Sequence, residues 1–558
     1  MVVPADEGLE LTPVPSDTVD SREATVRSAA VMSGGTLLSR VTGLLRVTVT
    51  LAALGFTVVS DSYNAANTTP NIIYELVLGG ILTSIFVPAL VGRGKDRGRE
   101  AQFETANRFL TIALVLLTGV AVAGAVAAPW IMRLYLGSVA DPVRHAQEVE
   151  LGTFFLRWFM PQIVFYGLGA VAGGLLTANR RFSAQMYAPV LNNLAVIATM
   201  LALIAMRGTT PPQVETLTLA EKTLLGAGTT LGVLAMTAAL WPALRRIGFR
   251  WRLRWDWRHE TVGQLFHLAR WVVVYVVANQ VAYLIIIRLA SRISAGAYTA
   301  YSQAFVFFSL PHAIVAVSIF TALIPGMAER WTSEDRSGIR HLFSRGFRDT
   351  MIVMIPAAAG YTVLAGPIVA LLAGHGAVRG VELPILARTL AGFAIGLPFF
   401  SAYQLMTRTL YAMRDSRTPA LVNIGVAVVN IGADLLFAFT WHRGVTGLAL
   451  GHAVSYVFGS VVLFVIVQRR LRGADERRIG MTISKTLLAG GVTAAAAFGA
   501  AALVDLALNV ERTFGRLIQV TAGVVAGVLV FLACALIFGI HEVDEVKAAL
   551  LGRMHRGA

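Results

Sequence analysis

Long apolar runs alternate with short polar connections along most of the chain. Fourteen runs are long enough to cross a bilayer as helices, because about 20 apolar residues span its hydrocarbon core. Their expected bounds are 27–56, 64–92, 104–134, 149–177, 185–206, 221–246, 262–290, 297–328, 346–373, 384–412, 418–441, 445–468, 482–508 and 516–540. In such runs the backbone hydrogen bonds must close within each segment. The pattern therefore predicts an all-α polytopic membrane protein.

The composition agrees with this class. Of the 558 residues, 56% are hydrophobic and 14% are charged, and the mean hydropathy is +0.67. The continuously apolar runs disfavour a β-barrel, whose strands alternate between apolar and polar residues. The net charge of +15 comes mostly from residues between the runs. This charge indicates membrane topology and contact with anionic membrane lipids, and no nucleic-acid partner is expected.

Basic residues gather in alternate connections, after the even-numbered runs. These clusters lie within 93–99, 180–181, 245–258, 330–345, 414–417 and 469–478. The positive-inside rule therefore places both termini in the cytoplasm. Residues 1–26 are polar and lack the basic start of a signal peptide, so they are predicted to form a disordered cytoplasmic tail. Residues 541–558 are expected to form a second cytoplasmic tail of a multi-pass plasma-membrane protein.

A weak internal repeat relates the first six runs to the next six. The glycine pairs at 228–232 and 447–451 each precede an arginine pair, and the segment at 188–193 resembles that at 418–423. Because six is even, both halves would cross the membrane in the same direction. This is a parallel repeat, typical of transporters with two rocking lobes. The predicted units are an N-lobe at 27–246, a C-lobe at 247–469 and a C-terminal helix pair at 482–540.

Charges inside the first two runs are the main candidates for function. Arg40 and Arg46 lie about 120° apart around a helix. Intramembrane charges usually face a water-filled cavity, and arginine binds phosphate with two parallel hydrogen bonds. We therefore interpret Arg40, Arg46, Asp61 and Glu75 as substrate-binding residues around a pyrophosphate. The arginines could instead reach a nearby interface. Asp61 could pair with an arginine across the cavity or only cap the turn, and Glu75 could be the internal counter-ion of Arg46.

Polar residues in two later runs extend the candidate site. Asn279, Gln280 and Arg288 are further substrate-binding candidates, although amides in a membrane also bond helices together. Asn430 and Asp434 lie four residues apart on one helix face and could couple transport to Na⁺ or H⁺. The alternative for Asp434 is a hydrogen bond to a neighbouring helix. The chain has no P-loop, H-E-x-x-H or G-x-S-x-G motif, so we expect no enzyme, catalytic residue, metal or cofactor.

Several short motifs follow one another in a specific order. They are Ser39-Arg40-x-x-Gly43-x-x-Arg46, Asp61, Pro70-Asn71, Gly79-Gly80, Phe86-x-Pro88, Ala188-Pro189-x-x-Asn192-Asn193, Leu310-Pro311 to Pro325, and Arg414-Asp415-Ser416-Arg417-Thr418-Pro419. This combination resembles the MurJ/MviN family of lipid II flippases. The resemblance implies the fold of the multidrug/oligosaccharidyl-lipid/polysaccharide exporter superfamily. It also implies movement of the undecaprenyl-pyrophosphate-linked peptidoglycan precursor, lipid II, from the inner to the outer leaflet by alternating access.

The resemblance further implies that Arg40 and Arg46 are cavity arginines and that the C-terminal helix pair forms a groove for the lipid tail. Proteins of cell-wall synthesis are candidate partners. The chain departs from the family at Tyr74 and Gly79, where members carry an arginine and an acid, and in the eighth run, which lacks their arginine. Arg288 or Arg292 is a candidate to compensate for these losses.

Three other functions stay open. Two belong to the same superfamily: an exporter of another lipid-linked oligosaccharide and a cation-coupled antiporter. A cavity with arginines should repel cationic drugs, which disfavours a drug antiporter. The third is a non-transporting scaffold for cell-wall enzymes.

Overall fold

The computed structural model describes residues 17–74, 87–136, 142–179, 181–254, 260–378, 380, 382–473, 475–508, 513–540 and 542. This part of the chain is almost entirely helical and contains no strand. Its helices are α1 (Asp17–Leu54), α2 (Val58–Tyr74), α3 (Val87–Tyr135), α4 (Pro142–Phe159), α5 (Gln162–Ala178), α6 (Ser183–Arg207), α7 (Leu219–Ala238), α8 (Trp241–Arg246), α9 (Glu260–Ile293), α10 (Ala297–Pro311), η3 (His312–Ala316), α11 (Val317–Thr332), α12 (Arg336–Ala373), α13 (Leu383–Ile395), α14 (Leu397–Ala412), α15 (Arg417–Asp434), η4 (Leu435–Thr440), α16 (Gly444–Leu471), α17 (Glu476–Ala507) and α18 (Thr513–Ile537).

The predicted polytopic helical fold is confirmed. Among the described residues, 12 helices are long and apolar enough to cross a membrane, or up to 13 if the bent pair α13–α14 is one span. The expected second run, 64–92, includes residues 75–86, which lie outside the described residues. The count of fourteen spans therefore stays a prediction.

Two helices have bounds that the apolar pattern did not indicate. Helix α1 begins at Asp17, so it extends into the segment 1–26 that was expected to be a disordered tail. Helix α3 includes a sharp change of direction at Gly98, whose φ of 80° is a conformation that glycine adopts readily.

Several expected spans are interrupted near their middle. Helix α10 ends at Pro311 and continues as the π-helix η3, because proline cannot donate the next backbone hydrogen bond. Helix α15 likewise passes into a π-helix, η4, directly after Asp434. Helices α13 and α14 meet at Gly396 with a bend of 47°. Such interruptions are tolerated within a membrane when neighbouring helices satisfy the freed backbone groups.

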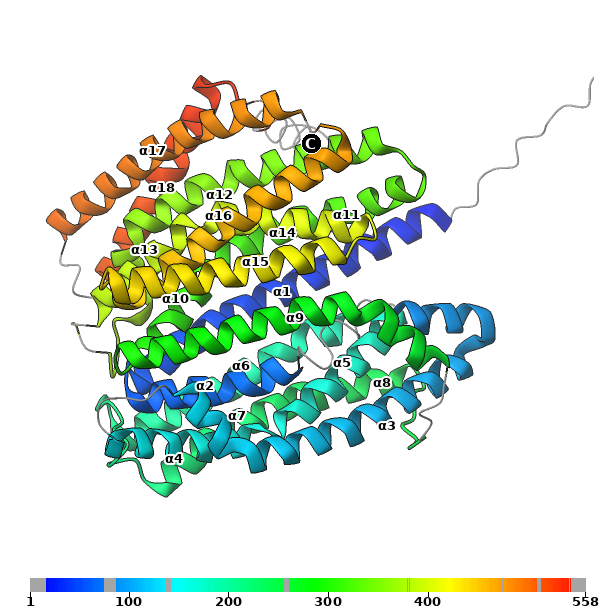
Figure 1. Cartoon of the computed structure of the whole chain (residues 1–558), viewed down its shortest axis with the longest axis horizontal. Coiled ribbons are helices and arrows are strands. Elements are labelled where there is room, and N and C mark those ends of the chain that lie inside the picture. Colours follow the sequence, from blue (N-terminus) through cyan, green and yellow to red (C-terminus); the bar gives the residue numbers. More distant parts are fainter. Residues whose placement is uncertain are drawn as a thin grey trace, which may run out of the picture.

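The helices pack in two groups, with α17 and α18 on the outside of the second (Figure 1). In the first group, α1 packs on α6, α6 on α7, α2 on α4 and α3 on α5. In the second, α9 packs on α15, α15 on α16, and α12 on α13 and α14. Helix α17 packs against both α18 and α12. The parallel repeat of lobes 27–246 and 247–469 stays a prediction.

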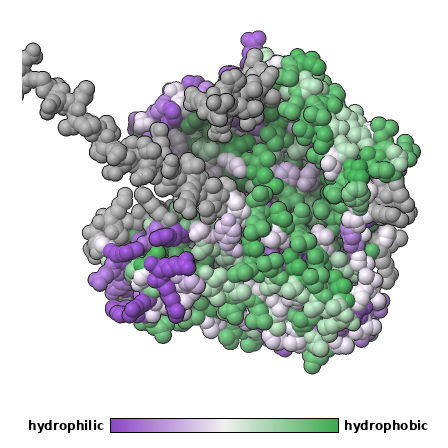
Figure 2. Space-filling view, turned by 180° about the vertical axis from the view of Figure 1, so that it is seen from behind, coloured by the Kyte–Doolittle hydropathy of each residue, from purple (hydrophilic) through white to green (hydrophobic). Residues whose placement is uncertain are grey.

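The outer surface is mostly apolar. Figure 2 shows hydrophobic residues over much of one face, with hydrophilic residues gathered at the end where α8 lies in Figure 1. Helices α17 and α18 contribute large exposed side chains such as Leu506, Phe514 and Ile537. This distribution suits a surface covered by acyl chains with one polar rim.

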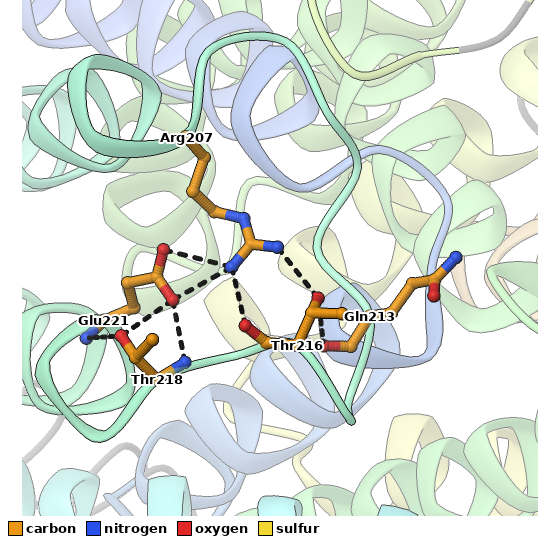
Figure 3. A network of polar contacts seen from close by, with 5 residues as sticks. All are labelled: Arg207, Gln213, Thr216, Thr218 and Glu221. Carbon is orange, nitrogen blue, oxygen red and sulfur yellow. Dashed lines mark hydrogen bonds and ion pairs between the residues drawn. The ribbon is translucent and has the colours of Figure 1, made fainter.

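A polar network orders the connection between α6 and α7 (Figure 3). The Arg207 guanidinium donates to both carboxylate oxygens of Glu221, at 3.0 and 2.9 Å, and to the Thr216 carbonyl at 3.2 Å. Glu221 also completes a capping box with Thr218 at the start of α7. The loop is thus held by side chains at both of its ends.

The Arg-Asp-Ser-Arg-Thr-Pro motif forms the turn between α14 and α15. The Asp415 carboxylate accepts a hydrogen bond from the Thr418 backbone N–H at 3.0 Å and pairs with Arg470 at the end of α16. Burial alone would raise the pKa of Asp415, but the Thr418 hydrogen bonds and the Arg470 charge together hold that pKa below its ordinary value. The motif therefore fixes the ends of three helices relative to one another.

Candidate functional site

The carboxylate of Asp61 joins the two groups of helices at one end of the molecule. Its Oδ2 accepts a hydrogen bond from the Gly296 backbone N–H at 2.7 Å. Its Oδ1 accepts bonds from the Thr299 backbone N–H at 2.8 Å and from the Thr299 hydroxyl at 2.7 Å. Asp61 is only 6% exposed, so these bonds are shielded from water. The side chain thus binds the start of α10 from α2.

The start of α10 needs this partner because of its own sequence. Gly296 occupies the N-cap position with φ of 77° and has no side chain to accept the free N–H groups. A Cβ at this position would lie 2.4 Å from the Phe56 carbonyl oxygen, so a larger capping residue does not fit. Asp61 of α2 accepts the hydrogen bonds of these N–H groups instead. The positive end of the α10 dipole also favours its negative charge. It makes no ion pair with an arginine among the described residues.

Other contacts reinforce the same junction. The Thr299 hydroxyl lies 3.0 Å from the Ser60 hydroxyl and accepts a bond from Asn64 at 3.1 Å. One turn further along, the hydroxyls of Thr68 and Tyr298 lie 3.0 Å apart. A backbone bond of 2.7 Å from the Ala377 N–H to the Ala52 carbonyl also crosses between the groups. We call this set of contacts, centred on Asp61, the interlobe closure.

A cavity of about 570 Å³ lies next to the closure, between α2 and the helices of the second group. Its polar lining consists of amides, hydroxyls and a histidine, and includes Asn71, Asn279, Gln280, Gln404, Asn430 and Ser455. None of its described lining residues is Asp, Glu, Lys or Arg. Aromatic side chains such as Tyr301 and Phe400 complete its wall. Such a lining can bind neutral polar groups by hydrogen bonds and ring faces.

The two candidate arginines of α1 lie outside the lining of this cavity. Arg40 is exposed and Arg46 is half-buried. Neither makes a hydrogen bond or ion pair with any residue that the structure describes. The two guanidiniums are therefore free to bind an anion near the boundary between the groups.

The other substrate-binding candidates divide between the cavity and its surroundings. Asn279 and Gln280 line the cavity. Arg288 instead donates a bond of 2.9 Å to the Leu134 carbonyl at the end of α3, and Arg292 lines a separate pocket of about 110 Å³ beside Asp61. Neither arginine therefore supplies a positive charge to the cavity.

Glu75, the remaining candidate, lies outside the described residues, as does Gly79. Their predicted roles stay predictions.

The predicted Asn430–Asp434 pair is present on one face of α15. Asn430 donates to Asp434 Oδ1 at 3.1 Å, and Asp434 is fully buried. Its Oδ2 has no hydrogen-bond partner among the described residues. Gly451 of α16 leaves the space for this carboxylate, since a Cβ there would lie 2.0 Å from Oδ1. A buried carboxylate with a free oxygen beside an amide can accept a proton or a cation.

Two residues of the second group were not identified from the sequence. Arg408 of α14 lies over the Phe320 ring at 5.2 Å. His452 lines the cavity and packs against Tyr456, with 4.7 Å between ring centroids. Arg408 carried a signal, as a charge inside an apolar run. No pattern in the sequence marks His452, because the aromatic side chains around it come from four separate helices.

Comparison with known proteins identifies the family to which this sequence is similar. The sequence model described as lipid II flippase MurJ matches residues 51–514. A lipid II flippase MurJ of Burkholderia cenocepacia is 27% identical over 448 residues, which are 80% of this chain and 84% of that protein. A probable lipid II flippase MurJ of Vibrio cholerae is 24% identical over 94% of this chain and 98% of its own length.

Solved structures agree on the fold. A lipid II flippase MurJ in an inward closed conformation matches with a TM-score of 0.72 and 19% identity, over 92% of this chain and 100% of that one. An inward-facing multidrug transporter of the MATE family, in the MOP superfamily, matches with a TM-score of 0.65 and 13% identity, over 77% and 94%. Because the family model covers most of the sequence, this chain belongs to the lipid II flippase MurJ family.

Proposed function

We propose that this protein is a transporter that moves lipid II from the inner to the outer leaflet of the plasma membrane by alternating access. The observation that carries the proposal is the match of the lipid II flippase family over residues 51–514. A flippase needs no catalytic group, and the sequence has no P-loop, H-E-x-x-H or G-x-S-x-G motif.

The interlobe closure supports the alternating-access part of the proposal. It joins the two groups of helices near the connection between the first two apolar runs. The distribution of loop arginines places that connection outside the cell. With the outer end closed, we infer that the cavity and α1 are reached from the cytoplasmic side. An inward-facing state of this kind is the one that lipid II would enter.

The chemistry of α1 and of the large cavity suggests that they bind different parts of lipid II. Arg40 and Arg46 bind the pyrophosphate, because free guanidiniums hold phosphate oxygens in pairs. Arg408 of α14, which lies over the Phe320 ring, is our candidate to compensate for the arginines that the chain lacks elsewhere. The uncharged cavity binds the sugar and peptide groups through its amides and hydroxyls. The polyprenyl tail remains in the lipid.

Asp434 provides the coupling of transport to a cation. Its unpartnered Oδ2 and the amide of Asn430 suit Na⁺ or H⁺, and Asn430 also lines the cavity, so occupancy by substrate and cation can influence each other. Anionic lipids that contact the loop arginines, and proteins of cell-wall synthesis, are the further partners that we propose.

The test is depletion of the native flippase in cells, complemented by variants of this chain. Arg40→Ala and Arg46→Ala should each fail to restore lipid II at the outer surface, measured by its accessibility to an added lipid II-cleaving enzyme. Arg46→Lys should restore part of it, because the charge remains but the paired geometry is lost. Arg443→Ala, an exposed arginine in a connection, is the matched control and should restore it fully. Full restoration by both Arg40→Ala and Arg46→Ala would contradict the proposed pyrophosphate site.

A further inference from the structure

A second polar cavity lies far from the candidate site, where the first turns of α12 and α17 meet. Its volume is about 350 Å³. Its lining includes Arg340, His341, Ser344 and Arg348 of α12, and Asp475 and Arg478 at the start of α17. No residue of this cavity contributes to the interlobe closure or to the candidate substrate site.

The charges of this cavity are only partly satisfied within the protein. Arg348, which is 4% exposed, donates to Glu542 at 2.6 Å and to the Ser344 hydroxyl at 2.5 Å. Arg340 and Arg478 make no ion pair or side-chain hydrogen bond with any described residue, and neither does the carboxylate of Asp475. Two guanidiniums and one carboxylate therefore line the cavity without a partner among the described residues; Asp475 and Arg478 are exposed and Arg340 is half-buried.

An apolar groove is lined by the residues that follow along the same two helices. Its volume is about 540 Å³, and its first lining residues are Phe347 and Met351 of α12 and Ile479 and Ile483 of α17. Phe347 and Ile479 directly neighbour Arg348 and Arg478 in the sequence. Within one helical turn, each helix thus passes from a charged lining to an apolar one, as the boundary between a lipid headgroup and its chain requires.

The groove is separate from the candidate substrate site. Helix α14 presents Phe400 and Gln404 to the large cavity and presents Phe399, Ala402 and Met406 to the groove. These two sets lie on different faces of the helix, so α14 forms a wall between the two spaces. Helix α18 contributes no lining residue to the groove. A chain held in the groove therefore lies away from the substrate path.

We propose that the cavity and the groove together bind one amine-bearing glycerophospholipid, of the phosphatidylethanolamine type. The lipid phosphate binds Arg340 and Arg478, the headgroup ammonium pairs with Asp475, and one acyl chain occupies the groove. This lipid complements all three unpaired charges, whereas a headgroup without an amine leaves Asp475 beside a phosphate with no cation. The bound lipid holds α17 against α12.

The test uses the full-length protein in nanodiscs that contain equal amounts of phosphatidylethanolamine and phosphatidylglycerol, with retained lipid measured by native mass spectrometry. The wild-type protein should retain one phosphatidylethanolamine. The double variant Arg340→Ala and Arg478→Ala should lower this retention about tenfold, because two charge-assisted contacts are lost. Asp475→Asn should abolish the preference between the two lipids while leaving binding of either.

Matched controls come from the same two helices. Arg336→Ala and Arg477→Ala remove exposed arginines that do not line the cavity and should leave retention unchanged. Ala359→Trp should fill the groove and displace both lipids. Elution as a single species on size exclusion identifies variants that fold.

Four results would overturn the proposal. They are a wild-type preference for phosphatidylglycerol, equal retention of the two lipids, retention that survives the double arginine substitution, and a polyprenyl lipid recovered in place of a phospholipid. None of these results depends on whether the protein transports lipid II.

Discussion

Replacing Asp61 with alanine tests the interlobe closure most directly. The substitution removes the acceptor of three hydrogen bonds, two of them from backbone N–H groups at the start of α10. Gly296 cannot provide a replacement, because it has no side chain. Losing these hydrogen bonds destabilises only the closed state, because α2 and α10 are separated in the open state in any case.

The magnitude follows from the environment of the carboxylate. A hydrogen bond to a charged group contributes about 1.5–3 kcal/mol, and a lost helix cap costs about 1 kcal/mol. The cost of burying the Asp61 charge offsets part of this gain. We expect a net loss of about 2–4 kcal/mol for the closed state, which changes the ratio of closed to open molecules by about 30- to 1,000-fold.

Distances between spin labels on the two groups provide the assay. Val143 of α4 and Ala295, just before α10, are exposed near this end and belong to different groups. Labels are placed there in a Cys534→Ser background, which removes the single native cysteine. Double electron–electron resonance should show one short distance in the wild-type protein and a large population at longer distance in Asp61→Ala.

Asp335→Ala is the matched control. Asp335 also caps a helix, accepting a bond of 2.8 Å from the Gly338 backbone N–H, and it pairs with Arg330 of α11, so all its partners belong to the second group. This variant should leave the label distance unchanged. If Asp61→Ala gives the same distance distribution as Asp335→Ala, the closure does not depend on Asp61 and our reasoning fails.

Three further predictions concern stability, measured as thermal unfolding of the purified protein. Gly451→Val should destabilise the protein by about 1–3 kcal/mol, because even a Cβ would lie 2.0 Å from Asp434 Oδ1 and 2.9 Å from its backbone nitrogen; an unchanged midpoint would show that α16 moves freely. Arg207→Ala should cost about 1.5–3 kcal/mol, because it leaves the nearly buried Glu221 carboxylate without its cation, and Arg207→Lys should recover part of this loss. Asp415→Asn should be less stable than wild type at pH 7, and the difference should shrink progressively as the pH falls below about 4, because the contribution of a carboxyl with a lowered folded-state pKa is fully present above its unfolded pKa and is lost as the pH falls through its folded pKa. A difference that is the same at pH 3 as at pH 7 would contradict this assignment.

The sequence predicted the structure correctly wherever the structure depends on neighbours within a few residues. Long apolar runs predicted the membrane helices, because a span must satisfy its own backbone in lipid. The spacing of four residues placed Asn430 and Asp434 on one face, where they bond at 3.1 Å. Helix α10 ends at Pro311, whose missing N–H is itself a local property of the sequence.

Predictions that depended on distant partners were weaker. The substrate-binding role of Arg288 stays a prediction, and its hydrogen bond to the Leu134 carbonyl, more than a hundred residues away in the sequence, could not be predicted from local spacing. Arg408 was visible as a charge in an apolar run, but its position over the Phe320 ring follows only from the packing of α14 against α11.

By itself, the sequence determined that this is a helical membrane protein and which short motifs link it to its family, since both follow from local composition and order. Only the tertiary structure decided what Asp61 does. Its partners, Gly296 and Thr299, lie 235 and 238 residues further along the chain. A carboxylate has the same local signature whether it binds an arginine, caps its own turn or caps another helix. The choice depends on which unsatisfied N–H groups the fold brings within hydrogen-bond distance, and that is a property of packing rather than of spacing.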